Sequence, residues 1–110
     1  MRLLIICLLL AGCATGMTPE AKLAKGFDTV TAAANTTTRL LDTEMISSAQ
    51  ARRVLTIGTI ADESLKAGEQ RLTQCRAQGG TDCAAAVSEI DMGSGLLLEI
   101  ERFLEAQEAN

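Results

Sequence analysis

Apolar residues recur at spacings of three and four along three long segments of this chain, and this pattern constrains its fold more than any other feature. Such spacing places side chains on one face of an α-helix. The three stripes contain Leu23, Phe27, Val30, Ala34, Thr37 and Leu41; Ala51, Val54, Gly58, Ala61, Leu65, Gly68, Leu72 and Cys75; and Val87, Ile90, Gly93, Leu97, Ile100 and Leu104. The connections are short, which favours antiparallel neighbours. The sequence therefore predicts an all-α fold, a small antiparallel three-helix bundle.

Capping signals set the expected bounds of the first two helices. Thr18-Pro19-Glu20 supplies an N-cap hydroxyl, a proline at the first helical position and a carboxylate near the positive helix end, so a helix is expected over residues 19–43. Ser47 and Gln50 have the spacing of a capping box. They predict a second helix that continues to about residue 78.

The pair Gly79-Gly80 should end the second helix, and Thr81 or Asp82 should cap a third helix over residues 82–107. Three further residues widen the apolar face of this third helix beyond a narrow seam: Met92, Leu96 and Phe103. We therefore expect it to be the most buried of the three, or else to face a partner.

Two features of the stripes bear on packing. Gly58 and Gly68 each cost about 1 kcal/mol relative to alanine inside a helix, so their place on the second stripe indicates that a neighbouring helix approaches closely there. The segment from Thr29 to Thr38 is rich in Thr and Asn, which are weak helix formers, so the first helix should be weakest there.

The first residues have the order of a secretory signal peptide. Arg2 provides a positive start, and the apolar run Leu3 to Leu10, which includes Cys7, is followed by small residues. A transmembrane helix needs about 20 apolar residues, so this run is too short to span a bilayer. Residues 1–12 are therefore predicted to be a cleaved signal peptide.

The tetrapeptide Leu10-Ala11-Gly12-Cys13 resembles the lipobox of bacterial lipoproteins at every position. The resemblance implies cleavage before Cys13, a diacylglyceryl group on its thiol and further acyl chains, such as palmitate, on the new amino terminus. Several chains together bind a membrane far more strongly than one. Ala14 stands where many Gram-negative lipoproteins retained in the inner membrane have Asp, so the resemblance points to the periplasmic face of the outer membrane of a Gram-negative host. Residues 13–17 would form a lipidated tether and residues 18–110 a helical domain.

Cys75 lies one turn before Gly79-Gly80, and Cys83 is expected in the first turn after it. An antiparallel hairpin would bring the two thiols face to face, and the compartment implied by the lipobox is oxidising, so we expect a disulfide. A redox or metal site is the alternative. The chain offers no third ligand, no His and no C-x-x-C spacing to favour it.

Composition argues against several functions. The formal charge is −4 and no cluster of Lys or Arg is interleaved with aromatic residues, so no nucleic acid is expected as a partner. The chain has no His, and no carboxylate pair or Lys stands out as a catalytic group, so we expect no enzyme activity, cofactor or metal. The expected partners are the membrane and, through a helical stripe, another protein or a second copy of the chain.

With its lipobox, its Thr-rich first helix, the segment Met45 to Arg52 and Leu96-Leu97-Leu98, the chain resembles small helical lipoproteins encoded in tailed phages and prophages of Gram-negative bacteria. The resemblance implies an envelope interaction protein that acts in lysis, as outer-membrane spanins do, or in blocking superinfection. Spanin subunits of the outer membrane are typically rich in proline, whereas this chain has only Pro19. The alternative is a structural module of a bacterial envelope complex that oligomerises through its stripe.

Overall fold

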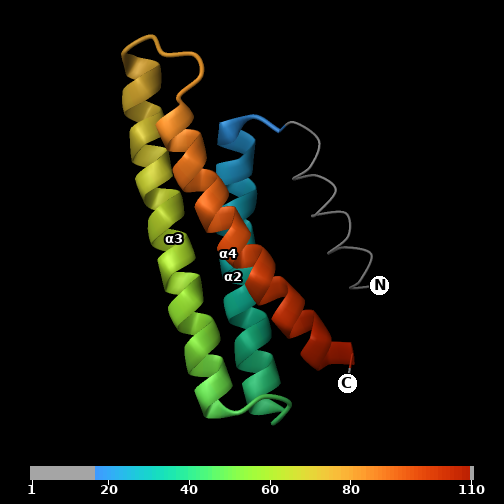
Figure 1. The fold of residues 1–110 in the computed structure, drawn as a ribbon. Coiled ribbons are helices and arrows are strands. Elements are labelled where there is room, and N and C mark those ends of the chain that lie inside the picture. Colours follow the sequence, from blue (N-terminus) through green and yellow to red (C-terminus); the bar gives the residue numbers. More distant parts are fainter. Residues whose placement is uncertain (1–16, 110) are drawn as a thin grey trace.

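The computed structural model describes residues 17–109, and residues 1–16 and 110 lie outside the described part. The described chain forms three helices, α2 (Pro19–Asp42), α3 (Ser48–Ala77) and α4 (Ala84–Ala109), and contains no strand. Consecutive helices run in opposite directions (Figure 1). The predicted all-α antiparallel three-helix bundle is confirmed.

The N-terminal caps of α2 and α3 are those that the sequence predicts. The Thr18 hydroxyl accepts a hydrogen bond from the backbone N–H of Ala21, and Pro19 occupies the first helical position. The Ser47 hydroxyl accepts from the Gln50 backbone N–H at 3.1 Å, and the Gln50 side chain accepts from the Ser47 N–H at 2.8 Å. These bonds satisfy backbone donors that the helix itself leaves without partners, so the two helices start where expected.

The C-terminus of α3 is a Schellman motif. The N–H of Gly80 donates to the carbonyl oxygen of Cys75 at 2.8 Å, and the N–H of Gly79 donates to Arg76 at 3.0 Å. Gly79 has a φ of 81°, a conformation that glycine adopts without steric cost. The predicted role of Gly79-Gly80 as the end of the second helix is confirmed.

The start of α4 differs from the prediction. The helix begins at Ala84 rather than 82, so neither Thr81 nor Asp82 caps it. Cys83 occupies the cap position instead: its carbonyl oxygen accepts the first helical bond from Val87, and its φ is 49°. Cys83 therefore precedes the first turn, and its disulfide side chain, which cannot accept a capping bond as a hydroxyl does, stands where a capping side chain was expected.

The core lies along the inner faces of all three helices. The buried residues of α3 and α4 follow the predicted stripes closely, with Ala86 buried in place of Val87. In α2, Leu23 and Thr37 are buried as predicted, whereas Ala33 and Leu40 are buried where Ala34 and Leu41 were predicted. Met92 is 57% exposed, so the expected widening of the third apolar face holds only for Leu96 and Phe103, which are partly buried.

Close approach between helices depends on three glycines. A Cβ atom at Gly68 of α3 would lie 2.6 Å from Cγ1 of Ile90 on α4, so the predicted close contact there is confirmed. At Gly58 the nearest atom would be an Ile100 carbon at an ordinary 3.8 Å, so no close approach requires that glycine. Gly26 of α2 and Gly93 of α4 approach Leu65, which is fully buried between them.

The Thr-rich segment of α2 is continuous helix. Hydroxyls of Thr29, Thr31, Thr37 and Thr38 donate to the carbonyl oxygen four residues earlier. The hydroxyl groups are thus satisfied inside the helix, including that of the buried Thr37, and the expected local weakness produces no break in the helix.

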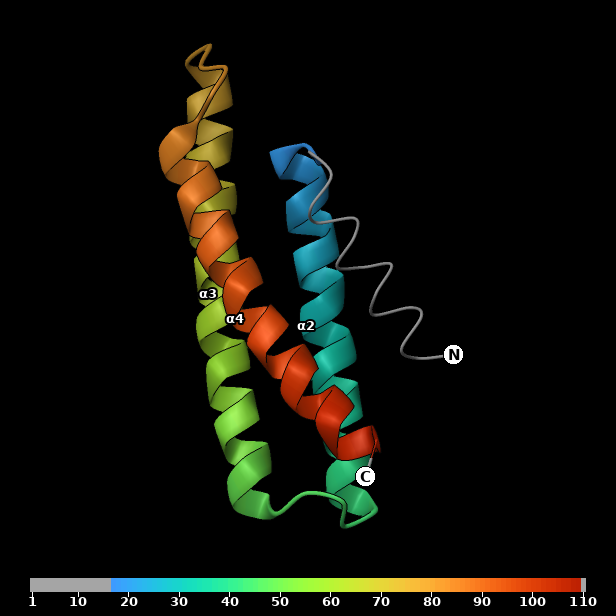
Figure 2. The same cartoon turned by 45° about the vertical axis from the view of Figure 1, so that its right-hand side comes forward.

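The long molecule has two different ends. Its principal extents are 50 × 26 × 15 Å. α4 starts beside the end of α3 and finishes beside the end of α2, where Arg39 and Glu108 form an ion pair (Figure 2). Among residues 17–109, no helix has the length and apolar character needed to cross a bilayer.

Candidate functional site at the tether end

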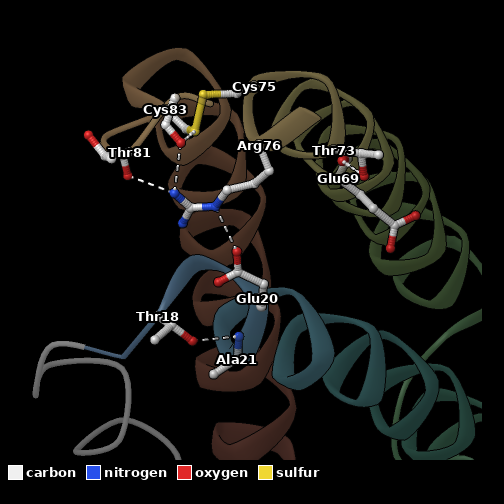
Figure 3. Close-up of polar contacts among 10 residues, drawn as sticks. Thr18, Glu20, Ala21, Glu69, Thr73, Cys75, Arg76, Thr81 and Cys83 are labelled. Carbon is white, nitrogen blue, oxygen red and sulfur yellow. Dashed lines mark hydrogen bonds and ion pairs between the residues drawn. A yellow bond between two sulfur atoms is a disulfide. The ribbon is translucent and has the colours of Figure 1, made fainter. Parts of the chain in front are cut away.

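The four lipobox residues, Leu10, Ala11, Gly12 and Cys13, lie outside the described residues. The described chain begins at Met17, directly before the N-cap Thr18. This end of α2 lies beside the turn between α3 and α4, as Figure 3 shows. The described chain therefore begins at the same end of the bundle as Cys75 and Cys83.

Cys75 and Cys83 are brought together as predicted. Their sulfur atoms are at bonding distance, 2.05 Å, and their Cα atoms are 5.8 Å apart. Gly80 makes room for this bridge, since a Cβ atom there would overlap Sγ of Cys75 and lie 3.0 Å from its carbonyl oxygen. Gly80 is thus needed to leave room for the disulfide, whereas Gly79 is needed for the positive φ at the end of α3.

Arg76 holds the turn against α2. Its Nη1 donates to the carbonyl oxygen of Thr81 at 2.7 Å and to that of Gly80 at 3.3 Å, and its Nε donates to Oε1 of Glu20 at 3.2 Å (Figure 3). One guanidinium therefore satisfies two carbonyl groups of the loop and forms an ion pair with the first turn of α2. All these contacts are exposed to solvent, so each is worth well below a buried hydrogen bond.

The charge on Glu20 suits its position. A hydrogen bond from its own backbone N–H lowers the pKa of the carboxyl below its ordinary value, Arg76 lowers it further, and slight desolvation opposes both. A carboxylate in the first turn also interacts favourably with the positive end of the helix dipole. Glu20 is therefore ionised throughout the neutral range and available to Arg76.

The chemistry of this end is structural. Both sulfur atoms are used in the S–S bond, so neither is a free nucleophile or a metal ligand in this state. Among the described residues, no three Cys, Asp, Glu or His side chains are grouped so that they could hold a metal ion. The arrangement fixes the end of the bundle at which the described chain begins.

A shallow groove of about 230 Å³ lies between α2 and α4. Its lining includes Gly26 and Leu97, and also Lys22 and Asp91, which form an ion pair of 3.3 Å. Glu101 lines the groove, and desolvation together with the nearby Glu105 raises the pKa of its carboxyl above the ordinary value. No buried polar side chain lacks a partner among the described residues, so the groove shows no group awaiting a ligand.

Sequence reasoning missed the roles of Arg76, Gly80 and Gly26. A basic residue in the last turn of a helix is a recognised signal for bonds to nearby carbonyl groups, so Arg76 could have been noticed. The close contact between Gly26 and Leu65 has no such signal in the sequence, because it depends on how α2 and α3 cross.

Comparison of the chain with models of known protein families, with curated proteins and with solved structures found no match.

Proposed function

We propose that this protein is a lipoprotein precursor, cut between Gly12 and Cys13 and held at the periplasmic face of the outer membrane by acyl chains on Cys13. The observation that carries the proposal is the tetrapeptide Leu10-Ala11-Gly12-Cys13 after a short apolar run. The cysteine thiol is the most nucleophilic group in that segment and is the group to which a lipid can be transferred.

An anchor at Cys13 would place one end of the helical domain near the membrane. Cys13 precedes the N-cap Thr18 by five residues, which span at most about 17 Å when extended. The end of the bundle near the membrane would then be the one closed by the Cys75–Cys83 bridge and Arg76. The connection between α2 and α3 would lie at the far end, because the 30 residues of α3 rise about 45 Å.

The proposed role of the domain is binding rather than catalysis. We assign it to the class of envelope interaction proteins encoded by phages and prophages, with a structural module of a bacterial envelope complex as the alternative. The genes beside its own separate the two: lysis or tail genes favour the first class, and envelope-assembly or conjugation genes favour the second. Capture of partners from solubilised membranes with a tagged mature chain would identify what it binds.

Labelling with radioactive palmitate tests the anchor. Replacement of Cys13 by Ser should abolish the label and leave an uncleaved precursor, whereas Cys7→Ser should behave as the parent, because Cys7 would be removed with the signal peptide. Equal labelling of the Cys13→Ser chain and its parent would show that the lipoprotein assignment is wrong. A further variant, Ala14→Asp, should move the labelled protein towards the inner-membrane fraction in a Gram-negative host.

A further inference from the structure

We propose that the exposed face of α3 between Arg52 and Glu63 pairs with the same face of a second copy, in antiparallel orientation. The inference concerns the helical domain alone and does not depend on lipidation. The face consists of four residues at spacings of four, three and four, all of them exposed: Arg52, Thr56, Thr59 and Glu63. It lies opposite the buried stripe of the same helix, which is used in the bundle core.

The two ends of this face carry opposite charges that have no ion-pair partner among the described residues. Arg52 is at one end and Glu63 at the other, about 16 Å apart along the helix axis. Lys66, the nearest cation to Glu63 along the helix, forms its ion pair with Asp62 at 2.9 Å, and Glu63 acts on it only through a weaker electrostatic interaction. A second copy in antiparallel orientation would place its Glu63 opposite Arg52 and its Arg52 opposite Glu63. The face is therefore complementary to itself.

The centre of the face suits a close helix contact. The hydroxyls of Thr56 and Thr59 donate to the carbonyl oxygens of Arg52 and Leu55, both at 2.9 Å. Their donors are thus already used inside the helix, and the compact side chains let a second helix approach to about 8 to 10 Å. Leu55 and Ile60 stand on the two sides of this row and are each 48% exposed. Pairing would remove part of their apolar surface from water.

Charge also selects the register. When the symmetry axis passes midway between Ile57 and Gly58, Arg52 meets Glu63 and Thr56 meets Thr59 of the second copy. In the two neighbouring registers Arg52 meets Thr56 or Gln70 instead, and Glu63 finds no cation. A parallel pair would oppose like charges at both ends, which is unfavourable. Only one antiparallel register matches both charges.

The dimer is compatible with two anchored chains. Its two-fold axis is perpendicular to α3, so the two Thr18 residues lie at the same height along that axis, at opposite ends of the pair. With the axis normal to the membrane, both bundles would lie along the bilayer surface, and both tethers could reach it. The contact involves few residues, so it is a weak, transient interface that a shared membrane would favour by concentrating the chains.

Charge exchange tests the proposal. The protein used is the chain from Ala14 to Asn110, which contains every described core residue. Sedimentation equilibrium from about 10 µM to about 1 mM in low salt should show a dimer of the parent. Arg52→Glu and Glu63→Arg should each weaken it about tenfold or more, because each opposes like charges at both ends. An equimolar mixture of the two variants should dimerise as the parent does, as should the double variant.

Two matched controls carry the same charge changes elsewhere. Glu99 and Arg102 lie exposed on α4, away from this face, and Glu99→Arg and Arg102→Glu should leave the dissociation constant within about threefold of the parent. Circular dichroism checks that each variant is folded. The proposal is overturned by a parent that is monomeric throughout the range, by single variants that dimerise as well as the parent, or by a mixture that remains monomeric.

Discussion

Replacing Gly26 by alanine should destabilise the bundle, whereas the same replacement at Gly95 should stabilise it. A Cβ atom at Gly26 would lie 2.8 Å from Cδ1 and 3.1 Å from Cδ2 of Leu65, a fully buried side chain that would have to shift within the packed core. At Gly95 the added atom would meet no heavy atom within 4 Å. Both glycines are inside helices, so the two variants differ mainly in packing.

The magnitudes follow from two opposing effects. Alanine is favoured over glycine in a helix by about 1 kcal/mol, and this gain applies at both positions. Overpacking a buried side chain costs about 1 to 3 kcal/mol, and this cost applies only at Gly26. The free energy of unfolding should therefore rise by about 1 kcal/mol for Gly95→Ala and be about 1 to 3 kcal/mol lower for Gly26→Ala than for Gly95→Ala.

Removing the opposing side chain should reverse the sign at Gly26. Leu65→Ala alone should cost about 2 to 5 kcal/mol, because it leaves a cavity in the core. In that background the methyl group of Gly26→Ala meets no Leu65 carbons, so it should now stabilise the protein by about 1 kcal/mol or more. Gly93→Ala is not suitable for the same comparison. Its Cβ atom would also lie 3.0 Å from the backbone oxygen of Ala61, which no side-chain substitution removes.

Urea unfolding followed by circular dichroism measures the free energy of unfolding of the parent, the three single variants and the double variant, and the slope against urea is compared between them as a check on two-state behaviour. The reasoning about Leu65 would be refuted if Gly26→Ala stabilised the parent as much as Gly95→Ala does. It would equally be refuted if Gly26→Ala had the same effect with and without Leu65→Ala, since the coupling between the two positions would then be zero.

Three further outcomes are expected. Reduction of Cys75–Cys83 opens a loop whose ends are 8 residues apart, and should cost about 2.6 kcal/mol, or about 13 °C in the melting temperature of a domain of this size. Replacement of Arg76 by Met should lower the free energy of unfolding by about 1 kcal/mol in urea unfolding. Two loop carbonyl groups would then bond to water in place of the guanidinium, and the ion pair with Glu20 would be lost. Glu101→Gln should raise the melting temperature at pH 7 but not near pH 4. Burial and Glu105 raise the folded-state pKa of Glu101, so its stabilising contribution is complete below the ordinary carboxyl pKa and is lost as the pH rises through the raised value.

Most stripe residues predicted for α3 and α4 are buried in the structure, because their spacing of three and four is long enough to fix one helix face. In α2 the prediction chose Ala34 and Leu41, whereas the structure buries Ala33 and Leu40. Each choice lies between two adjacent residues of the same kind, so hydrophobicity alone cannot distinguish them. The crossing of α4 over α2, seen in Figure 2, decides which of each pair faces inward, and that crossing is a property of the whole bundle.

The turn between α3 and α4 shows a different limit. Spacing about Gly79-Gly80 was sufficient to predict that Cys75 and Cys83 lie face to face. The cap of α4 was predicted wrongly because Thr81 and Asp82 have good capping side chains, yet the bridge fixes the position of Cys83 and the helix starts after it. A covalent constraint therefore outweighed a local preference worth about 1 kcal/mol.

Exposed apolar side chains are unevenly distributed along the bundle. Single exposed apolar residues are common in proteins, so their number means little. Their position is more informative: Leu41, Met45 and Leu55 are exposed around the connection between α2 and α3, at the end opposite the disulfide. The tether end is closed by a covalent bridge and by polar contacts of Arg76. If Cys13 is the anchor, the exposed Leu41, Met45 and Leu55 lie at the end of the bundle away from the tether, where a second copy or another envelope protein can reach them.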